Sequence, residues 1–89
     1  MAYVAGYCLI DDVSERAFQM ERGGTTTKGK SADGFAPLGP FLVPADQIEP
    51  SDVLLSLAVN GVERQRASTR SMIFDVPTLI AYVSEFMTL

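Results

Sequence analysis

The sequence predicts a small α+β fold that is mainly β, and three segments carry this prediction. Residues 3–10 are rich in β-forming side chains and apolar on both faces, which is typical of a buried strand. Residues 53–60 alternate in the manner of a strand and end in Asn60-Gly61, a strong hairpin signal that suits a type I′ turn. Residues 76–87 carry apolar side chains at i, i+3 and i+4 spacing, which predicts an amphipathic helix.

Shorter elements fill the rest of the chain. Asp75 is a suitable N-cap for the last helix, and Pro77 falls in its first turn. The other expected elements are a helix at residues 13–21 capped by Asp11 or Asp12, a loop at 25–34, a short strand at 41–43, a loop at 44–51 and a return strand at 62–66. Gly23 and Gly24 would end the first of these helices.

Composition excludes several classes of protein. The 89 residues are 47% hydrophobic and 20% charged, which describes one globular domain. Seven basic and eleven acidic residues give a net charge of −4, and no basic block suggests a nucleic-acid partner. No apolar run is long enough to span a membrane, and no signal peptide is evident, so we expect a cytoplasmic protein.

The single cysteine is not a candidate nucleophile. Cys8 has apolar neighbours, which predicts a buried thiol in a reducing compartment, and the chain has no histidine to activate it. The apolar strand begins almost at the N-terminus and the last helix runs to Met87-Thr88-Leu89. Complete domains usually carry polar leads at both ends, so we expect this chain to be part of a larger domain.

Chemistry-bearing residues gather near the first strand. Asp12, Arg16 and Gln19 stand at i, i+4 and i+7, which would place an anion, a cation and an amide on one helix face. Such a face can hold a metal ion and a charged substrate, but Asp12 is equally a helix N-cap and Arg16 its i+4 ion-pair partner. Lys30, in a Gly29-Lys30-Ser31 turn, is either a site residue or an exposed lysine.

Several motifs resemble those of the fumarylacetoacetate hydrolase family. Gly6-Tyr7, the run 11–16 (Asp-Asp-Val-Ser-Glu-Arg) and Gln19 resemble the family's Gly-Tyr, Asn-Asp-Val-Ser-Ala-Arg-Asp and Gln signature. Further matches follow in order at near-family spacing: Gly29-Lys30-Ser31, Pro37-Leu38-Gly39-Pro40, Val59-Asn60-Gly61, Arg64-Gln65, Ser71-Met72-Ile73-Phe74 and Phe86-Met87-Thr88-Leu89. Residues 14–24 are most similar to the branch that includes 2,4-diketo-3-deoxy-sugar-acid hydrolases and ureidoglycolate lyase-like proteins.

The resemblance implies a fold, a cofactor and a reaction. The fold would be part of the family's mixed β-roll with short helices, in a protein that forms homodimers. Asp12 would be a ligand of Mg²⁺ (or Mn²⁺ or Ca²⁺), Lys30 the catalytic lysine that also contacts substrate, and Arg16 and Gln19 substrate contacts. Substrates would be small 2-oxo or 2,4-dioxo acids, whose adjacent oxygens a hard divalent cation can chelate, stabilising the enolate that forms as the carbon–carbon bond breaks.

Departures from the family pattern limit these expectations. The family's upstream Glu-x-Glu ligand pair and downstream Thr-Gly-Thr-Pro segment are not in this sequence, and Asp11 replaces the usual Asn. We therefore expect a partial catalytic domain over residues 1–89, belonging to a magnesium-dependent hydrolase or lyase of 2,4-dioxo acids but inactive alone. The alternatives are an isomerase or decarboxylase of 2-hydroxymuconate-type acids, or a non-catalytic remnant that serves in interaction or dimerisation.

Overall fold

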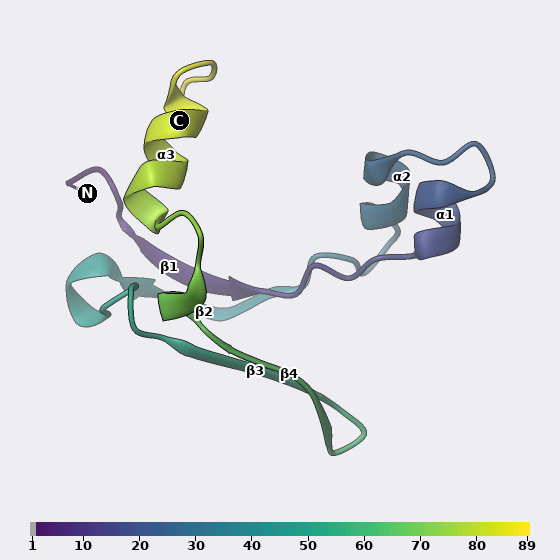
Figure 1. Ribbon diagram of the computed structural model, residues 1–89, viewed down its shortest axis with the longest axis horizontal. Helices are drawn as coiled ribbons and strands as arrows, with labels where there is room; N and C mark the ends of the chain where they lie inside the picture. The colour runs from purple at the N-terminus through teal and green to yellow at the C-terminus, as the bar shows by residue number, and fades with distance from the viewer. Residues whose placement is uncertain (1) are drawn as a thin grey trace. The chain divides into compact units, whose positions relative to one another are not determined.

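The computed structural model describes residues 2–89, which form two compact units. One unit is Ala5–Pro44, and the other is Ala45–Leu89 together with the N-terminal segment up to Val4. Each unit combines a two-stranded antiparallel sheet with short helices (Figure 1). This architecture confirms the predicted α+β class.

The sheet of the first unit pairs strand β1 (Gly6–Ile10) with strand β2 (Leu38–Pro44). Its register places Gly6 opposite Pro44 and Ile10 opposite Leu38, with an irregularity between Tyr7 and Leu9. The Asp11 N–H donates to the Pro37 carbonyl at 3.2 Å, so the strands stay together one step beyond the sheet. Residues 12–36 are thus a single excursion that leaves and re-enters the same end of the sheet.

The predicted burial of the first strand is wrong. Leu9 and Ile10 are more than half exposed, and the Cys8 thiol, which donates to the Phe41 carbonyl at 3.5 Å, is exposed as well. An apolar strand is covered only where another layer packs on it, and a sheet of two strands provides no such layer itself. The strand also begins at Gly6 rather than at residue 3, and its pairing with β2 starts at Gly6, opposite Pro44.

Two short helices fill the excursion and lie side by side (Figure 1). Helix α1 (Arg16–Met20) is capped by the Glu15 carboxylate, which accepts the Ala17 N–H at 3.0 Å. Helix α2 (Thr26–Lys30) is capped by the Thr25 hydroxyl, which accepts the Lys28 N–H at 3.1 Å.

These caps correct two predictions. Asp11 and Asp12 do not cap α1, because Glu15 supplies the oxygen that satisfies its first free N–H groups, so the helix is shorter than the predicted 13–21. The predicted loop at 25–34 contains α2, where a threonine cap and two lysines in the last turn favour a helix that has no apolar stripe. Gly23 does follow the first helix with a positive φ of 66°, as expected of a glycine beyond a helix end.

The second unit contains a hairpin of β3 (Leu54–Val59) and β4 (Val62–Ser68). Asn60 and Gly61 have φ values of 51° and 76°, the pair of positive angles that a type I′ turn requires, which confirms the predicted turn. A bulge opposite Leu57 and Ala58 brings Glu63 and Arg66 to the same face of β4. There Arg66 Nε donates to both oxygens of the Glu63 carboxylate, at 3.1 Å to Oε1 and 3.0 Å to Oε2.

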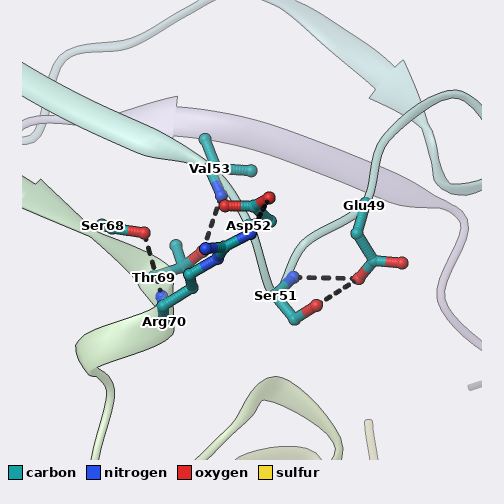
Figure 2. A network of polar contacts seen from close by, with 7 residues as sticks. All are labelled: Glu49, Ser51, Asp52, Val53, Ser68, Thr69 and Arg70. Carbon is teal, nitrogen blue, oxygen red and sulfur yellow. Dashed lines mark hydrogen bonds and ion pairs between the residues drawn. The ribbon is translucent and has the colours of Figure 1, made fainter.

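A polar network closes the open end of this hairpin (Figure 2). Val53 and Thr69 bond reciprocally: the Val53 N–H donates to the Thr69 hydroxyl at 2.8 Å, and the Thr69 N–H donates to the Val53 carbonyl at 2.9 Å. Arg70 contacts the Asp52 carboxylate at 2.6 Å, and the two Ser51 donors bond the Glu49 carboxylate. The 3-10 turn at Thr69–Ser71 therefore has a structural role: its bonds hold the end of β4 against the start of β3.

The last helix is α3 (Val76–Ser84), capped by Asp75 as predicted. It ends before the predicted Met87, and Phe86 and Met87 are exposed rather than in a core. Among the helices of residues 2–89, none combines the length and the apolar character that crossing a membrane demands.

Candidate functional site

An ion pair joins Asp12 to Lys30 at the end of the β1–β2 sheet. Asp12 lies two residues beyond β1, Lys30 is the last residue of α2, and Lys30 Nζ is 2.6 Å from Asp12 Oδ2. The Lys30 side chain is 26% exposed and that of Asp12 is 71% exposed, so the aspartate side chain remains open to solvent while the lysine side chain is mostly covered. An accessible carboxylate beside a positioned ammonium group can bind both a cation and an anionic substrate.

Arg16 and Gln19 form a second pair on α1. Arg16 Nη1 donates to Gln19 Oε1 at 2.6 Å, one helical turn apart. Because the Gln19 carbonyl oxygen accepts this bond, its NH₂ group is left as a donor, and the remaining guanidinium N–H groups are donors too. The pair therefore offers donors to a negatively charged group.

The predicted single face of Asp12, Arg16 and Gln19 is wrong in its geometry. Asp12 precedes the Glu15 cap and lies outside the helix, so the i, i+4, i+7 spacing does not apply to it. The structure instead arranges two pairs, and α2 joins them: Gly29 lies against Gln19, and the next residue, Lys30, bonds Asp12.

Sequence reasoning missed two residues that build this corner. Glu15 caps α1, and its N–H donates to the Gly29 carbonyl at 2.9 Å, which ties the start of α1 to the end of α2. The sequence indicates Gly29 only as a turn residue beside Lys30. Its close contact with Gln19 could not be found without knowing that residues 26–30 form a helix.

The side chains present fit a divalent cation in kind but not in number. Carboxylate oxygen is the ligand type that Mg²⁺ prefers, and Asp12 presents one. Within the described residues 2–89, however, there is no cluster of three or more acidic, histidine or cysteine side chains that could hold a metal. Asp12 can be one ligand, and residues 2–89 alone do not complete a metal site.

Comparison with known proteins gives a consistent family. A family model described as the C-terminal domain of fumarylacetoacetate (FAA) hydrolase matches residues 1–89. A relative from Burkholderia multivorans that is named only as a hydrolase is 52% identical to this chain over 88 residues. The match covers 98% of this chain and 31% of the relative.

Solved structures agree with this match. A fumarylacetoacetate hydrolase from Exiguobacterium antarcticum superposes with a TM-score of 0.91 at 45% identity, over 99% of this chain and 31% of that one. A 5-carboxymethyl-2-hydroxymuconate delta-isomerase from Mycobacterium smegmatis has a TM-score of 0.87 at 39% identity, over 99% of this chain and 34% of that one. The chain thus spans about a third of the length of the relatives it matches.

Proposed function

The chain belongs to the fumarylacetoacetate hydrolase family, and from this membership we propose that it supplies part of the active site of a metal-dependent enzyme that cleaves a carbon–carbon bond in 2,4-dioxo acids. The observation that supports the proposal is the 2.6 Å contact of Lys30, the last residue of α2, with Asp12, close to the Arg16–Gln19 pair of the adjacent helix α1. A cation, a carboxylate and a donor pair at one sheet end suit a small, multiply charged substrate.

In the proposed reaction, water adds to the 4-carbonyl of the substrate and the bond between carbons 3 and 4 breaks. The electron pair of that bond stays with the 2-oxo acid fragment until carbon 3 takes a proton, and the other fragment leaves as a carboxylic acid. Negative charge grows on the oxygens of the 2-oxo fragment during this step. The Lys30 ammonium group and the donors of Arg16 and Gln19 would stabilise that charge.

The proposed cofactor is Mg²⁺, with Mn²⁺ or Ca²⁺ as substitutes, and Asp12 would be one of its ligands. When bound, the ion would add concentrated positive charge beside adjacent carbonyl and carboxylate oxygens. The other ligands would come from parts of the enzyme that this chain does not include.

A paired substitution in the full natural polypeptide tests the proposal. We expect Lys30→Met to lower kcat/KM for an acylpyruvate about 100- to 1000-fold, the range for losing one donor to a developing oxyanion. Arg64→Met, which removes a cation from β4, should leave it near the wild-type value. The measurement is loss of diketo-acid absorbance with Mg²⁺ and after chelation by EDTA. Full activity in Lys30→Met would refute the proposal.

An isomerase of 2-hydroxymuconate-type acids is the second candidate. The mycobacterial isomerase structures that match this chain at 39% identity favour it, and the same donor pairs would serve a dienol substrate. Incubating the polypeptide with both substrate classes separates the candidates, because an isomerase shifts the absorbance of the dienoate without cleaving the acylpyruvate.

A further inference from the structure

Helix α2 packs through a residue that has no side chain. Its sequence is polar throughout, and Gly29 is the only residue classed as buried in the part of the chain that the structure describes. A helix without an apolar stripe normally has little to hold it in place. The packing of α2 on α1 therefore depends on how closely the backbone at Gly29 approaches.

The approach is closer than any side chain allows. A Cβ at Gly29 would lie 2.5 Å from Gln19 Cβ and 3.0 Å from Gln19 Cα, whereas ordinary contact begins at 3.4 Å. Adding one methyl group would separate the helices by about 1 Å, because close-packed backbone cannot absorb the overlap. The bond from the Glu15 N–H to the Gly29 carbonyl would be strained by the same movement.

A second set of contacts fixes the orientation of α2. Lys28 Nζ donates to the Arg22 carbonyl at 2.7 Å, just beyond the end of α1. The Lys28 and Arg22 cations also lie 5.8 and 5.5 Å from the ring centroid of Phe18, a residue of α1. With Lys28 held at this position and Gly29 packed on Gln19, the backbone from which the Lys30 side chain reaches Asp12 is fixed relative to α1.

We propose that Gly29 is a positioning residue, whose contact with Gln19 sets the separation of Lys30 from Asp12. The importance of this separation for catalysis rests on the proposed function, but the contact and its effect on the ion pair do not. Gly29 itself touches no reacting atom in this scheme and acts only through Lys30 and Gln19.

The experiment measures the ion pair directly in the full natural polypeptide. Lys30 is acetylated under limiting reagent, and its extent of modification is normalised to that of the same polypeptide in urea. Asp12→Ala, which removes the partner, defines the unpaired level. We expect Gly29→Ala to raise Lys30 acetylation several-fold toward that level.

A matched glycine substitution separates positioning from stability. Gly34 has a φ of 79° and nothing within 4 Å of its would-be Cβ, so Gly34→Ala strains the backbone without crowding α1. Its Lys30 acetylation should stay at the wild-type level. A folded Gly29→Ala with wild-type acetylation, or an equal rise in Gly34→Ala, would overturn the proposal.

If Gly29→Ala does not fold, Gln19→Gly added to it removes the shortest of the contacts, the 2.5 Å contact to Gln19 Cβ, and leaves those of 3.0 Å to Gln19 Cα and 3.2 Å to Gln19 N. Acetylation of Lys30 in this double variant should return toward the wild-type level, and a level equal to that of Asp12→Ala would overturn the proposal. Acetylation needs neither substrate nor metal. Full activity of Lys30→Met would therefore refute the proposed function only. The role of Gly29 would still be tested by the extent of Lys30 acetylation.

Discussion

At the scale of single residues, the orientation of the Gln19 amide is the most informative detail. Its carbonyl oxygen accepts from Arg16, so its NH₂ group is the part left for a ligand. Gln19→Glu keeps the acceptor for Arg16, and even adds a charge to that bond, but replaces the donor with a second acceptor. The variant should therefore remain folded and lose affinity for an anionic substrate.

The expected size of this loss is about 10- to 100-fold in kcat/KM, which corresponds to one hydrogen bond to a charged group. Gln65→Glu is the control, because it makes the same substitution on β4 in the other unit. Steady-state kinetics on an anionic 2,4-dioxo acid provide the measurement. Equal kinetics for the two variants would show that Gln19 serves only to hold Arg16.

At the scale of elements, the sequence predicts best where cap, period and turn agree. Asp75 and Pro77 mark the start of α3, and Asn60-Gly61 marks the hairpin turn; the structure has both. Helix α2 was missed because its residues lack apolar periodicity, and the cap at Thr25 is its main local signal. Asp12 and Lys30 are 18 positions apart, and their contact depends on α2. The sequence therefore indicates both residues as candidates but does not predict that they touch.

The cap of α3 also makes this element sensitive to acid. Hydrogen bonds from Thr78, first from its side chain and then from its backbone N–H, lower the pKa of Asp75. A carboxyl group whose pKa is lower in the folded state stabilises the fold above its unfolded pKa, near 3.9, and loses that contribution as the pH falls through the folded value.

We therefore expect α3 to loosen below about pH 4, as the stabilising contribution of the Asp75 carboxylate is lost. In Asp75→Asn, which still accepts a hydrogen bond as a cap, the Asp75 contribution to this transition should disappear. Thr78→Val, which removes the hydroxyl donor, should move the transition toward neutral pH. Helix content followed by circular dichroism against pH measures all three, and a curve unchanged by either substitution would contradict the assignment.

At the scale of the whole molecule, the family match explains a surface that the sequence alone misjudged. Composition and periodicity indicate a core, yet no large hydrophobic side chain within the described residues is buried. Strands β1 and β3 and helix α3 carry the apolar side chains that the sequence indicates, but within the described residues many of these side chains are exposed, among them Leu9, Leu54 and Leu79. The chain spans about a third of the length of its relatives, and we propose that further segments or a second copy cover these side chains in the intact enzyme.

This exposure leads to a prediction about residues 1–89 in isolation. Two-stranded sheets are marginal in water, and large exposed apolar patches promote association, so the isolated chain should bind a hydrophobic dye such as ANS and self-associate as its concentration rises. Replacing Ile73 and Phe74, which are 91% and 60% exposed, with serine should reduce both effects, whereas Arg64→Ser on β4 should not. Dye fluorescence and sedimentation velocity provide the readouts. A monomer that unfolds cooperatively and leaves the dye dark would show that these apolar faces pack together within the chain itself.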